Sequence, residues 1–234
     1  MNENTDRKKF FGSLAIPALL ATLMLAVKMV EMAFSMDFSS WGLTPKTMSG
    51  LRGILTMPFL HGSWEHLLTN VPAVLVLGTA LYYCYPTLAN RVMLITWIAS
   101  GLLTWCIGVQ NSIHVGASAL IYGLNLFLIV SGFIRGNRQL IVISLIMVFL
   151  YGGFIWGMIP TLAKLQNISW EGHLSGAIVG VALALVFRKK GPQKEEHHWD
   201  EDLDDDHEDP NEKPYWDVPT PTDDDLKVEY RFRR

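Results

Sequence analysis

His61-Gly-Ser-Trp-Glu-His66-Leu-Leu-Thr-Asn70 places two histidines and an asparagine where a long apolar segment of the chain begins. Strongly polar groups in a lipid environment are costly and usually mark a functional site. Two later stretches open further apolar segments in the same way: Gly116-Ala-Ser118-Ala-Leu-Ile-Tyr122-Gly123 and Glu171-Gly-His173-Leu-Ser-Gly176. The three stretches predict that polar side chains gather where helices enter a membrane.

The chain around these stretches is organised in long hydrophobic blocks. Half of its 234 residues are hydrophobic, and a helix crosses a bilayer with about 17 to 25 apolar residues. Six blocks meet this length, so we predict an all-α membrane protein with six transmembrane helices. Their ranges are 11–34, 64–84, 91–108, 115–133, 140–160 and 170–187.

Basic residues predict the orientation of these helices. They collect at the N-terminus, in the loops after the second and fourth segments, and directly after the sixth. Because cytoplasmic loops are enriched in lysine and arginine, both termini are predicted to be cytoplasmic. We therefore expect residues 1–10 to be a cytoplasmic N-terminus, residues 11–190 to be the six-helix domain, and residues 191–234 to be a cytoplasmic tail.

The tail differs sharply in composition from the rest of the chain. Residues 1–190 contain 13 Lys and Arg against 6 Asp and Glu, whereas residues 191–234 contain 6 against 16. So acidic a segment buries too little apolar surface to offset the entropy lost on ordering. We expect a disordered acidic appendage. The alternative is a segment that docks a cytoplasmic partner around Tyr215-Trp216 and Tyr230-Arg-Phe-Arg-Arg234.

The spacing of the polar residues indicates their chemistry. His66 and Asn70 are four residues apart, so they share one face of a helix, and two donors on one face suit the stabilisation of an oxyanion. His61 lies five residues before His66 and is expected in the entry loop. Zinc-binding helices of proteases use His-Glu-x-x-His, which is not the pattern here, so neither a metal nor a cofactor is predicted.

A nucleophile and a base are expected on two other segments. Ser118 follows Gly116-Ala117 at a helix start, where unpaired N–H groups and the helix dipole favour a developing negative charge. His173 is followed one turn later by Gly176, a small residue that lets its helix approach a neighbour closely. The approach would bring His173 to Ser118, the minimal pair for acyl transfer, with Tyr122 one turn below the serine to pack against the histidine ring.

Together these motifs resemble the signature of the rhomboid intramembrane serine proteases, and the similarity runs from about Leu51 to Phe187. The resemblance implies a six-helix bundle with a Ser118–His173 dyad and no catalytic aspartate, in which Ser118 is the nucleophile and His173 the general base. It further implies two groups of residues: His66 and Asn70, which with the Ser118 backbone N–H stabilise the oxyanion, and His61, Gly116, Tyr122 and Gly176, which support the site.

Two positions depart from the family pattern. Ala119 follows the expected nucleophile where many members have glycine, which affects helix packing and not the chemistry. A Trp-Arg pair common in the first loop of the family is not matched near Leu51-Arg52-Gly53. This second departure bears on how the first loop sits in the membrane.

The implied function is cleavage of transmembrane segments of membrane proteins near the outer membrane face. The expected partners are a single-pass membrane protein as substrate and the lipid bilayer, with no nucleic acid, and the expected location is the bacterial cytoplasmic (inner) membrane. Two other functions stay open. A non-proteolytic rhomboid-like protein that binds membrane clients should lack the serine or the histidine. A channel or transporter with a histidine proton path should carry polar groups along a helix to its opposite end.

Overall fold

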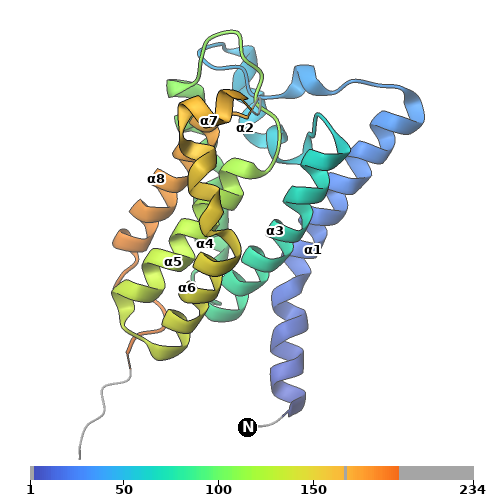
Figure 1. The fold of residues 1–234 in the computed structure, drawn as a ribbon. Coiled ribbons are helices and arrows are strands. Elements are labelled where there is room, and N and C mark those ends of the chain that lie inside the picture. The colour runs from blue at the N-terminus through green and yellow to red at the C-terminus, as the bar shows by residue number, and fades with distance from the viewer. Residues whose placement is uncertain (1–2, 166–167, 195–234) are drawn as a thin grey trace, which may run out of the picture. The chain divides into compact units, whose positions relative to one another are not determined.

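The structure, a computed structural model, describes residues 3–165 and 168–194. Within these ranges the chain forms a helical bundle (Figure 1). α1 lies at one edge, and α5 packs against α3, α4, α6 and α8. The long helices are α1 (Glu3–Phe34), α3 (Trp64–Cys84), α4 (Ala89–Ile107), α5 (Ser118–Arg135), α6 (Arg138–Tyr151) and α8 (Trp170–Val186). The short elements are α2 (Gly53–Thr56), α7 (Pro160–Leu165) and the 3-10 turns η1 (Ser39–Trp41), η2 (Ser49–Arg52), η3 (Met57–Phe59) and η4 (Gly152–Met158). The predicted all-α bundle is confirmed.

The bundle has the length and the surface of a membrane protein. Five described stretches are long and apolar enough to span a bilayer: Thr5–Phe34, Trp64–Cys84, Ala89–Ile107, Ser118–Arg135 and Arg138–Met158. α8 is apolar but has 17 residues, so its span remains a prediction. Large apolar side chains such as Leu94, Leu145 and Phe149 are exposed on the helices, which a soluble protein rarely tolerates in such number. The chain is an integral multi-pass membrane protein.

Three helix boundaries differ from those read from the sequence. α1 begins at Glu3, eight residues before the predicted span, because helix-compatible polar residues continue the apolar segment. α5 begins at Ser118 itself, after a loop that includes Gly116. The predicted segment 140–160 is not one helix, because α6 ends at Tyr151 and the chain continues as the 3-10 turn η4. The acidic tail lies outside the described residues from residue 195 onward.

α5 and α8 approach each other backbone to backbone. A Cβ atom added at Gly176 would collide with the carbonyl oxygen of Ala119, and one added at Gly180 would collide with the backbone of Gly123. Small residues are therefore required along this seam, as in other membrane helix pairs that pack closely. α5 also packs against α3, α4 and α6, so four of the other five long helices contact it.

The loop between α1 and α3 lies at the end of the bundle where α3, α5 and α8 begin, which we call the site end (Figure 1). Two indole N–H groups of α4 fix it: Trp97 donates to the carbonyl of Ile54 (2.8 Å), and Trp105 donates to that of Thr47 (2.9 Å). The loop is thereby held against α4, next to the starts of the three helices.

The same loop contains a tryptophan–arginine pair that is not visible as a sequence motif. The Arg52 guanidinium lies 4.9 Å from the ring centroid of Trp41 and donates to the carbonyl of Ser40 (2.9 Å). A guanidinium at this distance is attracted by the indole face. The two residues are eleven positions apart, so only the folded loop brings them together.

Arg135 closes the opposite end of the bundle. Its guanidinium donates hydrogen bonds to three carbonyl oxygens, those of Phe187 (2.7 Å), Lys190 and Pro192 (3.2 Å). The residue is buried, and such charge-assisted bonds are stronger than neutral ones. The bundle therefore continues at least to Pro192, two residues beyond the boundary predicted at residue 190.

We predict that Gly180→Ala lowers the free energy of unfolding by about 1–3 kcal/mol, because the added methyl group meets the Gly123 backbone and overpacking costs this much. Thermal unfolding of the purified protein in detergent measures the change. Gly12→Ala in α1 is the control, since nothing lies within 4 Å of its added Cβ and alanine is the better helix former. Equal melting temperatures for Gly180→Ala and the wild type would contradict the close approach.

Candidate active site

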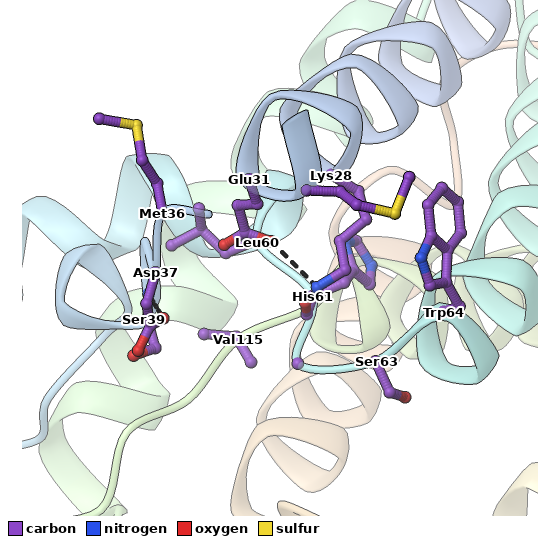
Figure 2. A pocket seen from close by; sticks show the side chains of 12 residues that line it. Lys28, Glu31, Met36, Asp37, Ser39, Leu60, His61, Ser63, Trp64 and Val115 are labelled. Carbon is purple, nitrogen blue, oxygen red and sulfur yellow. Dashed lines mark hydrogen bonds and ion pairs between the residues drawn. The ribbon is translucent and has the colours of Figure 1, made fainter. Parts of the chain in front are cut away.

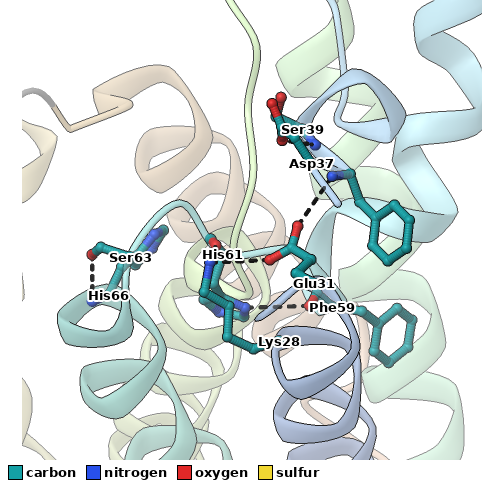
Figure 3. A network of polar contacts seen from close by, with 9 residues as sticks. Lys28, Glu31, Asp37, Ser39, Phe59, His61, Ser63 and His66 are labelled. Atoms are coloured by element: carbon teal, nitrogen blue, oxygen red, sulfur yellow. Dashed lines mark hydrogen bonds and ion pairs between the residues drawn. The ribbon is translucent and has the colours of Figure 1, made fainter. Parts of the chain in front are cut away.

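Ser63 fixes the start of α3. Its hydroxyl oxygen accepts a hydrogen bond from the backbone N–H of His66 (3.1 Å; Figure 3), so it satisfies one of the free N–H groups of the first helical turn. His66 therefore lies in the first turn of α3, and Asn70 follows one turn later on the same face. His61 precedes the helix and lies in the entry loop, as the sequence predicts.

His61 and Asn70 form a buried pair. The amide nitrogen Nδ2 of Asn70 lies 3.0 Å from Nε2 of His61. Because an amide nitrogen only donates, Nε2 is the acceptor and the ring carries its proton on Nδ1, which faces the Phe59 carbonyl oxygen at 3.4 Å. The second N–H of Asn70 is left to bind another group.

Gly116 brings the loop before α5 against this pair. It has a φ of +106°, and its N–H donates to the carbonyl of Met57 (2.8 Å). A Cβ atom at this position would lie 2.5 Å from Cε1 of His66 and 3.4 Å from the Asn70 amide nitrogen. Both the backbone conformation and the space therefore require glycine. His66 and Asn70 face the chain two residues before Ser118.

Ser118 is the first residue of α5 and is partly exposed. Ala117 holds the N-cap position and provides no side-chain cap, so the N–H groups of the first turn are left for water or a ligand. Within residues 3–165 and 168–194, the hydrogen bond of the His173 ring goes to Gly157 and not to Ser118. Hydrogen bonds between catalytic groups are often long before a substrate binds.

The His173 ring is held between α5 and η4. It stacks on Tyr122, with the ring centroids 4.1 Å apart and the planes 12° from parallel, and its Nδ1 lies 2.9 Å from the carbonyl oxygen of Gly157. Nδ1 must donate to this carbonyl, which leaves Nε2 as the nitrogen that can accept a proton. Tyr122 is fixed in turn, because its hydroxyl donates to the carbonyl of Phe154 (2.7 Å).

Helical spacing relates Ser118 to this ring. Ser118 is one turn before Tyr122 on α5, so the two residues share a face, and Tyr122 stacks on His173. Ala119, next to the serine, meets the backbone of Gly176, which is one turn after His173. The serine and the histidine therefore lie at the same end of the α5–α8 seam.

A cavity of about 730 Å³ opens beside this cluster (Figure 2). It extends from the last turns of α1, where Lys28 and Glu31 line it, past His61 and Trp64 to Val115. Val115 is the residue before Gly116, so the cavity reaches the loop that leads to α5. In the part of the chain that the structure describes, no three His, Cys, Asp or Glu side chains gather as a metal site requires.

The structure adds His114, which the sequence reading missed. Its ring is buried, and Nδ1 forms a hydrogen bond with the hydroxyl of Ser169, the N-cap residue of α8. This bond ties the loop before Ser118 to the start of the helix that carries His173. The available signal was a histidine only four residues before the expected nucleophile.

Lys28 and Glu31 of α1 were also missed. Lys28 Nζ lies 3.0 Å from Glu31 Oε2 and donates to the backbone carbonyl of His61 (2.8 Å; Figure 3). Two opposite charges three residues apart in an apolar segment were the signal, because charges in such segments are rare and usually functional.

Comparison with known proteins decides the family. Residues 49–190, more than half of the chain, match the Rhomboid domain family model. The chain belongs to the rhomboid family. An uncharacterized protein of Mycobacterium tuberculosis is 36% identical over 191 residues, which is 79% of either chain, and one of Mycobacterium leprae is 35% identical over 182 residues, 75% of this chain and 71% of that protein. Rhomboid-like protein 11, chloroplastic, of Arabidopsis thaliana is 24% identical over 162 residues, 58% of this chain and 52% of that protein.

The rhomboid domain contains every site residue expected from the sequence and also His114. Lys28 and Glu31 lie outside the matched residues, although Lys28 donates a hydrogen bond to the entry loop. The contribution of α1 is therefore a feature of this chain that the family model does not describe.

We predict that acid destabilises this rhomboid protein through His61. Burial and the nearby His66 lower the pKa of His61 from 6.5 to about 4, so the unfolded chain binds a proton at a higher pH than the folded chain does. Stability is then lost as the pH falls below 6.5, down to about 4. The melting temperature in detergent should fall between about pH 7 and about pH 5.

His61→Gln is the matched variant, because glutamine can accept the Asn70 hydrogen bond without titrating. Its melting temperature should fall less over the same range. Some dependence will remain, since burial also lowers the pKa of His114. A slope equal to that of the wild type would mean that His61 is not the group that is protonated.

Proposed function

We propose that this rhomboid protein is an intramembrane serine endopeptidase that cleaves transmembrane segments of membrane proteins. The observation that carries the proposal is the seating of His173, with Tyr122 stacked on the ring and the Gly157 carbonyl at Nδ1. This seating leaves Nε2 to act as a base, at the end of the seam where Ser118 begins α5. A serine activated by a histidine is a sufficient nucleophile for acyl transfer.

In the proposed reaction, Nε2 of His173 takes the proton of the Ser118 hydroxyl as Oγ attacks the carbonyl carbon of the scissile peptide. The carbonyl oxygen becomes negatively charged and accepts hydrogen bonds from His66, Asn70 and the backbone N–H of Ser118. The C–N bond then breaks, and His173 gives its proton to the leaving amine. Water, deprotonated by the same histidine, finally attacks the ester; the bond between the acyl carbon and Oγ breaks, and His173 returns the proton to the Ser118 oxygen.

The proposed substrate is a single-pass membrane protein. Backbone in lipid is helical with its hydrogen bonds satisfied internally, so the scissile peptide must leave its helix before Ser118 can reach it. Small or helix-destabilising residues near the membrane surface favour this local unwinding. The cavity beside His61 supports the proposal, because it gives water a route to the site end.

The proposed location is a bacterial cytoplasmic (inner) membrane with both termini in the cytoplasm. The distribution of lysine and arginine supports this orientation, and the mycobacterial relatives support the bacterial setting. In this orientation the site end faces outward, so cleavage takes place near the outer membrane face.

We predict that Ser118→Ala and His173→Ala each abolish cleavage of a model membrane substrate while the protein stays folded, because each removes half of the dyad. Labelling of the full chain with a fluorophosphonate, which reacts with activated serines, should be lost in both. Ser49→Ala in the exposed loop is the control and should label and cleave as the wild type does. A wild-type protein that binds clients but neither labels nor cleaves would instead be a non-proteolytic member of the family.

We predict that Asn70→Ala lowers kcat by about 10- to 1000-fold and changes KM much less, since an oxyanion donor acts mainly in the transition state. Steady-state kinetics on the purified protein in detergent measure both constants. Asn90→Ala is the matched control, because Asn90 is exposed at the start of α4, away from the site end. A rise in KM with an unchanged kcat would make Asn70 a substrate-binding residue.

A further inference from the structure

α1 carries two charged residues that are mostly buried in an otherwise apolar span. The side chains of Lys28 and Glu31 are 16% and 10% exposed, and both lie within the membrane-spanning stretch Thr5–Phe34. Charges in such a position raise the free energy of the folded protein unless they are paired and hydrogen-bonded. The hydrogen bonds of Lys28 and Glu31 therefore indicate the role of these two residues.

The pair connects α1 to two other segments of the site end. Lys28 Nζ donates both to Glu31 Oε2 (3.0 Å) and to the backbone carbonyl of His61 (2.8 Å). Glu31 Oε1 accepts a hydrogen bond from the backbone N–H of Phe38 (3.1 Å). The lysine thus holds the entry loop at the position of His61, and the glutamate holds the lysine (Figure 3).

The entry loop is in turn the support of the oxyanion donors. His61 accepts the hydrogen bond of Asn70 (3.0 Å), and the T-shaped contact between the rings of His61 and His66 spans 5.1 Å. A shift of the His61 backbone therefore moves the partner that orients Asn70. Displacements of about 1 Å are enough to lower an enzymatic rate by about 100-fold.

We propose that Lys28, held by Glu31, is a positioning residue for the oxyanion donor Asn70. The inference rests on the proposed function and deepens it, since it assigns part of the catalytic geometry to a helix outside the matched rhomboid domain. Lys28 acts through the carbonyl of His61 and touches neither the substrate nor the dyad.

The cavity beside the entry loop shows why this bond matters. Lys28, His61, Gly62 and Ser63 all line the same space of about 730 Å³. The face of the entry loop that lines the cavity is not packed against other side chains in the described part of the chain, so no packing restrains the loop there. The hydrogen bond from Lys28 replaces that restraint.

The test compares turnover per active site in four variants of the full chain, with active sites counted by fluorophosphonate labelling so that misfolded protein is excluded. Lys28→Met should lower kcat by about 10-fold with little change in KM. Lys28→Arg, which keeps a donor, should stay within about 3-fold of the wild type. Lys46→Met, the same change at an exposed lysine of the loop between α1 and α3, should have no effect.

The fourth variant, Lys28→Met with Glu31→Gln, separates positioning from charge burial. It removes both charges, and glutamine keeps an oxygen for the N–H of Phe38. Positioning predicts that kcat stays about 10-fold low, because the bond to His61 is still missing. Recovery of wild-type turnover in this variant would overturn the proposal, since neutralising Glu31 would then be the whole role of Lys28.

A double-mutant cycle identifies the residue through which Lys28 acts. If it acts through Asn70, Lys28→Met should reduce kcat by less than about 2-fold in an Asn70→Ala background, because coupled residues are not additive. A full reduction of about 10-fold in that background would overturn the proposal. A wild-type protein that labels and cleaves while Lys28→Met is unchanged refutes the positioning role alone, whereas a wild-type protein that does neither refutes the proposed function and this inference with it.

Discussion

The contact between the backbones of α5 and α8 is the constraint on which the candidate site depends. Lipid offers helices no hydrophobic drive to associate, so close packing and hydrogen bonds must hold them together. Gly176 and Gly180 leave no room for side chains against Ala119 and Gly123, which fixes the separation of the two helices and their relative height. Because Ser118 and His173 both lie in first turns at the same end, this one contact sets where the two side chains are relative to each other.

The other half of the site is held by hydrogen bonds. His66 and Asn70 of α3 lie against Gly116 in the loop before α5. Asn70 is oriented by its hydrogen bond to His61, and the backbone carbonyl of His61 accepts a hydrogen bond from Lys28 of α1. The van der Waals contact between two closely packed backbones weakens as soon as they move apart, whereas a hydrogen bond can be exchanged for one with water. The two halves of the site therefore differ in how easily they are disturbed, and the oxyanion side has the softer support.

Helical periodicity explains how much of this arrangement the sequence could predict. The apolar blocks predict the helices, the four-residue spacing puts His66 and Asn70 on one face, and the position of His173 in its segment puts it in a first turn. A contact made through a backbone carbonyl requires no particular residue type, so it produces no pattern in the sequence. The seat of His173 depends on the carbonyl of Gly157 in η4, an irregular turn in a stretch that reads as continuous helix. The contacts of His114 with Ser169 and of Lys28 with His61 join segments dozens of residues apart, so spacing alone could not reveal them.

The pairing of Lys28 with Glu31 within one helix has a consequence for biogenesis. α1 leaves the ribosome before α3, and an unpaired charge in an inserting helix adds up to about 3 kcal/mol to the free energy of insertion, the most at the helix centre. Residues three apart meet on the same face as soon as the turn forms, so α1 brings its own counter-ion into the bilayer. The segment can insert into the membrane on its own, and the entry loop later offers the Lys28 ammonium group one more acceptor.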